Sequence, residues 1–324
     1  MEVLTIENKD MIPTNLELLV SVLRSITFGI IGTIFPVVSF LIFFMPSPAI
    51  WLGVKRGVTK ALLSTLIVSL AMGLIGGFTF MAMYLFVAIP IVFITITLIK
   101  EEKESYKIIA INMLAIVIMA VVFFINFKYI MNIDVITGIS KSIDTAANDF
   151  IKIIEERGMP NIAMSRGEIL KLVDLIKLTL PGSSIICAIS FVFLSYIYAL
   201  NMLRRDNYNV KHRLRFIDIR MPKKSLILIV VTGTALVLLY ALKIQYFDII
   251  FINTVSVIGF LFMMAGIFTI DYYFINKMPR ALRFIIPMLV IILFYGSYLY
   301  MIVGLLDSFV NFRKRFERVE NEKI

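Results

Sequence analysis

The chain of 324 residues has little of the chemistry on which metal sites and hydrolytic sites depend. Cys187 is the only cysteine and His212 is the only histidine. One cysteine excludes an intrachain disulfide, and one histidine excludes a histidine-based metal or proton-relay cluster. The patterns GxxxxGKS/T, HExxH, CxxC and GxSxG do not occur either. We therefore predict that the protein is neither an enzyme nor an ATP motor, and that it has no catalytic residue, cofactor or metal ion.

Charged residues are scarce as well. They make up 17% of the chain and hydrophobic residues 60%, against about 25% and about 45–50% in soluble domains. Several apolar runs are about 18 residues or longer, which is the length needed to cross about 30 Å of hydrocarbon. The sequence therefore predicts an all-α, polytopic transmembrane helical bundle whose first partner is the lipid bilayer.

The net charge of +10 does not indicate nucleic acid as a partner. The basic residues gather in short loops beside apolar runs, where such residues set the orientation of a membrane protein. The N-terminal stretch MEVLTIENKD lacks the basic start of a cleaved signal. We therefore expect the first spans to be retained.

The apolar runs predict about eight spans, with nine as the alternative. The capping-box spacing of Thr14 and Glu17 predicts a helix that begins near Asn15. Apolar sequence then continues to Val54, which is too long for one span. Either one span at about 25–45 precedes a re-entrant segment, or two short spans meet near Pro36. The later runs cover 57–77, 78–99, 108–130, 181–203, 225–242, 248–270 and 284–306.

A ladder of small residues begins at the run 57–77. Its six members recur at every fourth position: Gly57, Ala61, Thr65, Ser69, Gly73 and Gly77. Small residues on one helical face allow another helix backbone to approach closely. The ladder predicts a helix-packing face, and a solute-lining face is the alternative.

The longest polar interval, 131–180, predicts two amphipathic helices that lie on the membrane surface or cover the bundle. The first face comprises Ile143, Ala147, Phe150, Ile151 and Ile154. A second capping box, Ser165 and Glu168, precedes the second face, which comprises Ile169, Leu172, Val173, Ile176 and Leu180. These helices separate an N-terminal set of spans, 1–130, from a C-terminal set, 181–324.

Basic residues predict the sidedness of the bundle. The loop 204–224 carries eight basic residues against two acidic ones, so we place it in the cytoplasm. Counting spans backwards places 131–180 outside and the turns 100–107 and 55–57 inside. The C-terminal region is in conflict, because basic residues at 277–283 and 313–318 both favour the inside although one apolar run separates them. Either 284–306 forms a broken hairpin or one basic group lies outside.

Few polar residues fall within the apolar runs. Arg24 is either an interfacial anchor or a buried charge that needs a partner. The acids Asp248, Asp271 and Asp307 lie near predicted membrane interfaces, where an ionised side chain is less costly than at the bilayer centre. Four asparagines predict hydrogen bonds between helices, namely Asn112, Asn126, Asn201 and Asn253.

Four stretches together resemble the YybS-like family of bacterial membrane proteins. They are PSPAIWLGVKRG at 46–57, LPG at 180–182, RFIDIRMPKK at 215–224 and GLLDSFVNFRKR at 304–315. The residues that carry the resemblance are Pro46, Pro48, Pro181, Phe216, Pro222, Gly304, Asp307, Phe312 and Arg313. The resemblance implies a multi-pass protein of a bacterial cytoplasmic membrane.

The proline-rich element and its basic-glycine turn are also similar to the substrate-binding (S) components of energy-coupling-factor vitamin transporters. That similarity implies a membrane subunit that binds a small molecule and works with a separate ATPase and scaffold subunit. S components are shorter and have fewer spans, and their small-residue motif lies on the first helix. We therefore expect a transporter-like protein that binds or translocates a small solute. The alternative is a scaffold that docks a cytoplasmic partner or anionic lipid through the basic loop and tail.

Overall fold

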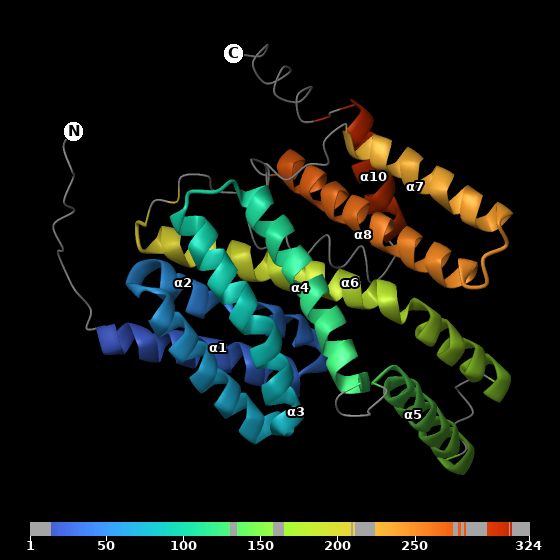
Figure 1. Cartoon of the computed structure of the whole chain (residues 1–324), viewed down its shortest axis with the longest axis horizontal. Coiled ribbons are helices and arrows are strands. Elements are labelled where there is room, and N and C mark those ends of the chain that lie inside the picture. The colour runs from blue at the N-terminus through green and yellow to red at the C-terminus, as the bar shows by residue number, and fades with distance from the viewer. Residues whose placement is uncertain are drawn as a thin grey trace. The chain divides into compact units, whose positions relative to one another are not determined.

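A computed structural model shows an all-helical protein (Figure 1). It describes residues 14–129, 135–157, 165–208, 210, 224–274, 278–279, 282, 297–310 and 312, and no strand occurs in these ranges. The chain divides into two compact units. Unit 1 comprises Met1–Val135 and Cys187–Arg213, and unit 2 comprises Ile136–Ile186 and Leu214–Ile324.

The first five elements of the chain belong to unit 1. They are α1 (Thr14–Ile34), the 3₁₀ helix η1 (Pro36–Phe44), α2 (Ser47–Arg56), α3 (Val58–Lys100) and α4 (Ser105–Tyr129). The start of α1 agrees with the predicted start near Asn15. The break after it falls near Pro36, as in the second predicted arrangement, because α1 ends at Ile34 and η1 begins at Pro36. A short helix, α2, follows η1. Pro36 and Pro46 explain these joints, since proline has no backbone N–H to continue a preceding helix.

Helix α3 consists of two arms. Gly77 has φ 80° and ψ 175°, which are not helical values, and only glycine adopts them without strain. A continuous helix would place Val68 and Ala88 about 30 Å apart, yet both belong to one packed cluster. The arms therefore fold back on each other at Gly77. The boundary predicted between the runs 57–77 and 78–99 is confirmed.

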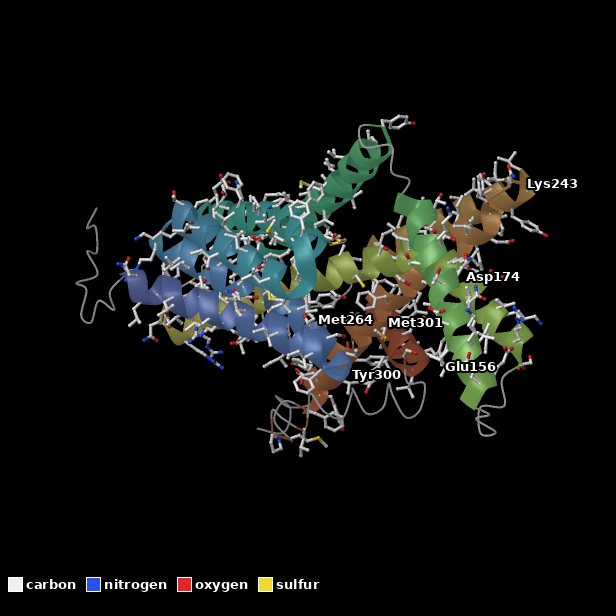
Figure 2. The ribbon with its side chains drawn as sticks, turned by 90° about the horizontal axis from the view of Figure 1, so that it is seen from below. Glu156, Asp174, Lys243, Met264, Tyr300 and Met301 are labelled. Carbon is white, nitrogen blue, oxygen red and sulfur yellow. The ribbon has the colours of Figure 1, made fainter. Side chains whose placement is uncertain are left out.

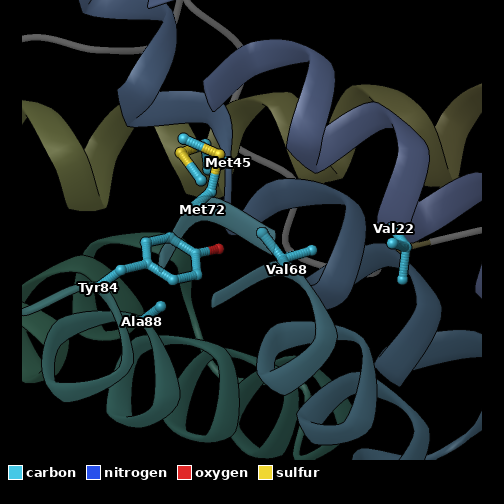
Figure 3. Close-up of a cluster of buried hydrophobic side chains, with 6 residues drawn as sticks. All are labelled: Val22, Met45, Val68, Met72, Tyr84 and Ala88. Carbon is cyan, nitrogen blue, oxygen red and sulfur yellow. The ribbon is translucent and has the colours of Figure 1, made fainter. Parts of the chain in front are cut away.

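The folded-back arms enclose the core of unit 1 together with α1 and the segment that leads into α2. Figure 3 shows this core, which comprises Val22, Met45, Val68, Met72, Tyr84 and Ala88. The Met45 and Met72 side chains are fully buried and lie together. Helices in a bilayer associate through close packing of their side chains, so this shared core holds the first helices of unit 1 together.

Unit 2 contains α5 (Val135–Arg157), the first part of α6 (Arg166–Arg205), α7 (Lys224–Ala241), α8 (Phe247–Phe274) and α10 (Ser297–Val310). The capping box that opens α6 is confirmed: the Glu168 carboxylate accepts a bond from the Ser165 backbone N–H at 2.7 Å, and Ser165 Oγ accepts one from the Glu168 N–H at 3.3 Å. Helix α6 does not stop before Pro181, however. The amphipathic segment and the run 181–203 form one helix, and they are not separate as predicted.

The predicted amphipathic faces are confirmed in part. On α5, Ala147 and Ile151 are buried, whereas Phe150 is exposed. On α6, Ile169 and Val173 are buried, whereas Leu172 and Ile176 are exposed. An ion pair at 2.5 Å between Lys177 and Asp144 joins the two helices. The charged residues Glu156 of α5 and Asp174 of α6 are exposed (Figure 2).

Four described helices are long and apolar enough to cross a membrane: Asn15–Ile34, Val58–Lys100, Arg166–Arg205 and Phe247–Phe274. Shorter apolar helices cover Ser105–Met119, Ile229–Ala241 and Ser297–Val310. These findings support a helical membrane protein. The count of eight or nine spans stays a prediction, and the conflict at 284–306 falls largely outside the described residues.

Candidate functional site

Unit 1 contains several buried polar groups, and two sets of polar side chains there are candidates for a functional site. One is a set of three buried hydroxyls, Ser25 Oγ, Ser47 Oγ and Tyr84 Oη, which we call the buried hydroxyls. The other is a group of charged residues around Trp51, namely Glu17, Lys55, Arg56 and Asp206, which we call the ion-pair cluster. Each brings together segments that are distant in the sequence.

The buried hydroxyls come from three elements. Ser25 and Ser47 have no exposed surface and Tyr84 is 7% exposed. None of the three has a hydrogen-bond partner in the described part of the chain. A buried hydroxyl without a partner costs about 1–3 kcal/mol. Such groups are therefore rare unless water or a ligand satisfies them.

The surroundings of Tyr84 and Ser25 place these two hydroxyls at the same core. Tyr84 belongs to that core, and its hydroxyl points into the cluster (Figure 3). Ser25 lies on the face of α1 between Val22 and Gly29. A Cβ at Gly29 would meet the Met72 sulfur at 2.7 Å and the Met45 methyl at 3.0 Å, so this face of α1 is directed at the core. Ser47 begins α2, two residues after Met45.

The lining of this region is uncharged. The buried side chains are methionine, valine, alanine and tyrosine, with serine hydroxyls beside them. Methionine is unbranched and flexible, and it adapts to differently shaped neighbours. The region can therefore offer hydrogen bonds and an adaptable apolar wall, but it cannot balance a net charge.

Lys55 is the centre of the ion-pair cluster. Its ammonium lies 3.0 Å from Glu17 Oε1 on α1 and 2.6 Å from Asp206 Oδ2, which directly follows α6. Arg56 Nε donates to Glu17 Oε2, and Trp51 Nε1 donates to Asp206 Oδ2 at 2.9 Å. The last turn of α2 is thereby bonded to both α1 and the end of α6.

Helix geometry explains why these charges occupy these positions. Lys55 and Arg56 lie in the last turn of α2, where the helix dipole favours cations, and Glu17 lies in the first turn of α1, where it favours an anion. Trp51 precedes Lys55 by one turn, so both side chains lie on one face. The Lys55 ammonium is 4.8 Å from the centre of the Trp51 ring, within the range of a cation–π contact.

The Lys55 ammonium keeps its charge in this setting. Burial lowers the pKa of Lys55, but the hydrogen bonds to Asp206 and Glu17 outweigh burial and leave that pKa above its ordinary value. Glu17 is only 3% exposed. The cluster therefore pairs a buried carboxylate with cations that are still partly open to solvent.

The comparisons with known proteins agree with a membrane location. Residues 23–308 match the family described as "Predicted membrane protein (DUF2232)". The chain belongs to this family. The matched range contains the three buried hydroxyls and all of the ion-pair cluster except Glu17. No curated protein and no solved structure matches the chain.

The signature residues of the resemblance lie within the DUF2232 match except Phe312 and Arg313. Pro46 and Pro48 flank the start of α2, where both are buried. Pro181 lies inside α6. Gly304 and Asp307 are buried on α10, and Phe312 donates its backbone N–H to Asp307 Oδ1 at 2.9 Å. Phe216, Pro222, Arg313 and His212 lie outside the described residues.

The small-residue ladder has mixed surroundings. Ala61, Thr65 and Ser69 are fully buried. Gly57 and Gly77 have positive φ values and mark the two ends of the first arm of α3. A Cβ at Gly53 would lie 2.8 Å from the Ala61 Cβ, so α2 lies close to the ladder there. Its role as a packing face stays a prediction.

Asn253 bonds to two backbone groups of α6. Its Oδ1 accepts the backbone N–H of Gly182 at 2.5 Å, and its Nδ2 donates to the Leu178 carbonyl at 2.8 Å. These two backbone groups would otherwise bond to each other in α6. The carboxamide of Asn253 bonds to both groups instead, directly after Pro181 in α6, and so joins α8 to α6. Asn112 bonds to Thr95 at 3.1 Å.

Other predicted candidates have structural surroundings. Arg24 is exposed, and its guanidinium lies 5.8 Å from the Trp51 ring centre. Asp307 is buried and bonds to Thr269 of α8 at 3.1 Å. Glu17, predicted as part of a capping box, is bonded instead to Lys55 and Arg56.

The buried hydroxyls and the ion-pair cluster were both missed by reasoning on the sequence. Ser25 and Ser47 look like ordinary small residues of apolar runs, and Tyr84 resembles the other twelve tyrosines. Lys55 and Arg56 were interpreted only as a topology signal. The acid Asp206 within the basic loop, and Glu17 before an apolar run, were the signals that could have indicated partners for them.

Proposed function

We propose that the protein is a transporter-like protein of a bacterial cytoplasmic membrane, and that it binds a small solute in the interior of unit 1. The observation that carries the proposal is the set of three buried hydroxyls without protein partners, on α1, α2 and the second arm of α3. Each of these hydroxyls destabilises the folded protein by about 1–3 kcal/mol if nothing bonds to it. A bound solute or water would supply the missing hydrogen bonds.

The chemistry of the lining indicates an uncharged solute. Burying a net charge without a partner is strongly unfavourable, and the described side chains of the core and the buried hydroxyls carry no charge. We therefore expect a compact molecule with hydrogen-bonding groups at its edge and an apolar body. The resemblance to YybS-like proteins and to S components, which implies a subunit that binds a small molecule, supports this proposal.

Mass spectrometry tests the proposal directly. The protein is purified gently, and the small molecules that it retains are compared with those of the triple variant Ser25→Ala, Ser47→Ala, Tyr84→Phe. We expect one solute to be present in the wild type and lost in the variant. Thr97→Val is the matched control, because it removes an exposed hydroxyl that bonds only to its own helix. Retention of lipid alone in all three proteins would contradict solute binding.

The scaffold function is the second candidate, and the charge of the loop 204–224 favours it. Eight basic residues against two acidic ones suit an acidic protein or anionic lipid. Arg204 and Arg205 end α6 and can be changed to glutamate in one variant. Under this proposal the variant loses a partner that co-purifies with the wild type. Recovery of an ATPase subunit would instead support the transporter-like function.

A further inference from the structure

Helix α2 links one of the buried hydroxyls, Ser47, to the ion-pair cluster. Helix α2 has ten residues, so it is about 15 Å long. Ser47 is its first residue, and Trp51, Lys55 and Arg56 occupy its later turns. Its residues from Ser47 to Val54 are all buried. A shift of this helix would therefore disturb both features.

Both ends of α2 are joints in the chain. The 3₁₀ helix η1 and two prolines precede it, and Gly57, with φ 101°, follows it. A residue with such a φ ends a helix, and glycine changes its backbone angles at little cost. The ion-pair cluster supplies polar bonds from the last turn of α2 to α1 and to the end of α6, in addition to the packing of Gly53 against Ala61 and Ile96 of α3.

The bonds of this cluster are of a kind that can open. The side chains of Lys55, Arg56 and Asp206 are 21%, 23% and 33% exposed, so water can replace each partner. Ion pairs with this degree of exposure contribute little free energy each. Glu17 is different, because it is buried and keeps Arg56 when Lys55 leaves. Release of Lys55 thus leaves no unpaired buried carboxylate.

We propose that Lys55 is a latch that holds α2 closed over the buried hydroxyls, and that its release from Asp206 and Glu17 allows a solute to enter and leave. The control of solute exchange by Lys55 rests on the proposed function. The holding of α2 by Lys55 is independent of that function, and the position of α2 can be measured in the absence of any solute.

The chain contains a built-in reporter for this motion. Trp51 is its only tryptophan. It is 5% exposed, it bonds to Asp206, and it lies against Lys55. If α2 moves, the indole loses these contacts and meets water, which shifts its emission to longer wavelength and increases quenching by acrylamide.

The experiment compares Lys55→Met and Asp206→Asn with the wild type in nanodiscs. We expect both variants to shift the Trp51 emission to the red and to increase acrylamide quenching. We also expect the exchange of the retained solute to be about fivefold faster, as the loss of a partly exposed ion pair implies. Lys55→Arg retains the charge and should restore wild-type behaviour. Lys60→Met is the matched control, since Lys60 makes no ion pair with the described residues.

The outcomes separate the two proposals. Unchanged Trp51 emission and quenching in both variants would overturn the latch, while mass spectrometry would still decide whether a solute binds. Increased quenching together with no retained solute in the wild type would overturn the proposed function and leave the closing role of Lys55 supported. Equal effects from Lys60→Met would show a general response to lost charge and would also overturn the latch.

Discussion

At the scale of single residues, the unusual feature of this protein is a set of buried, uncharged hydroxyls that have no hydrogen-bond partner among the described residues. The core of unit 1 contains hydroxyls that a packing argument alone would replace with methyl groups. By contrast, Tyr196 is also buried but shares a hydrogen bond of 2.7 Å with Ser105. The two tyrosines therefore form a natural pair for separating a structural hydroxyl from one that serves binding.

Tyr84→Phe should stabilise the solute-free protein. The change removes a buried hydroxyl without a partner and keeps the ring, so we expect a gain of about 1 kcal/mol. Tyr196→Phe breaks a satisfied bond, and we expect a loss of about 1 kcal/mol. Thermal unfolding of the two variants, followed by circular dichroism after removal of small molecules, measures both. Loss of stability in Tyr84→Phe would show that its hydroxyl has a partner.

At the scale of elements, glycines decide how closely α8 and α10 approach. A Cβ at Gly266 would lie 1.9 Å from the Tyr300 carbonyl oxygen, and a Cβ at Gly304 would lie 2.0 Å from the Phe262 carbonyl oxygen. Figure 2 labels Met264 of α8 and Tyr300 and Met301 of α10, which come from this pair of helices. Backbone atoms on both sides of the contact leave no side chain that could move away, so the contact requires glycine.

Gly304→Ala should therefore separate α8 from α10. The backbone clash cannot be relieved by a rotamer change, and we expect a loss of stability of about 2–3 kcal/mol, in the range of overpacking substitutions. Gly233→Ala on α7 is the control, because a Cβ there meets no atom within 4 Å and alanine favours a helix by about 1 kcal/mol over glycine. Thermal unfolding of both variants is the measurement, and equal stability of the two would refute the close-contact argument.

The contact between α6 and α8 also requires a glycine, but there the glycine leaves room for a polar side chain. A Cβ at Gly182 would lie 2.6 Å from Asn253 Oδ1. Glycine thus admits the asparagine that replaces a backbone bond of α6 next to Pro181. Pro181 and Gly182 thus act together with Asn253 to join α6 and α8. This structural role explains the LPG motif, so the motif does not have to be part of a ligand site.

At the scale of the whole molecule, the structure of unit 1 constrains the topology. Lys55 bonds to Asp206, so the turn 55–57 and the end of α6 lie at the same end of unit 1. The folded-back arms of α3 bring Ile96 against Gly53, so the turn after Lys100 is at that end as well. These are the three turns for which the basic residues predict a cytoplasmic location.

Cysteine labelling tests this sidedness. In a Cys187→Ala background, Lys103→Cys and Asn207→Cys should react with a membrane-impermeant maleimide only in inverted vesicles, because both positions are exposed and share one end of unit 1. Gly138→Cys, in the interval predicted to be outside, should react only in right-side-out vesicles. Opposite behaviour of Lys103→Cys and Asn207→Cys would contradict the arrangement of unit 1.

Composition and periodicity were enough to predict an all-helical membrane protein, the start of α1, the break at Gly77 and the capping box of α6. Each depends on local chemistry: apolar length, glycine, or two residues three positions apart. The same reasoning failed where a helix could continue through a proline. The amphipathic segment was predicted to end before Pro181. The helix continues because the Asn253 carboxamide bonds to the backbone groups of Leu178 and Gly182. Asn253 lies 72 positions after Pro181, so a local pattern could not indicate this contact.

By itself, the sequence determined that this chain belongs in a membrane, since that conclusion depends only on which residues are present. Only the tertiary structure decided which polar groups lack partners and which charges meet. A serine within an apolar run is ordinary until the chain around it folds and provides no partner for its hydroxyl. A lysine beside an arginine is a topology signal until two distant carboxylates fold against it.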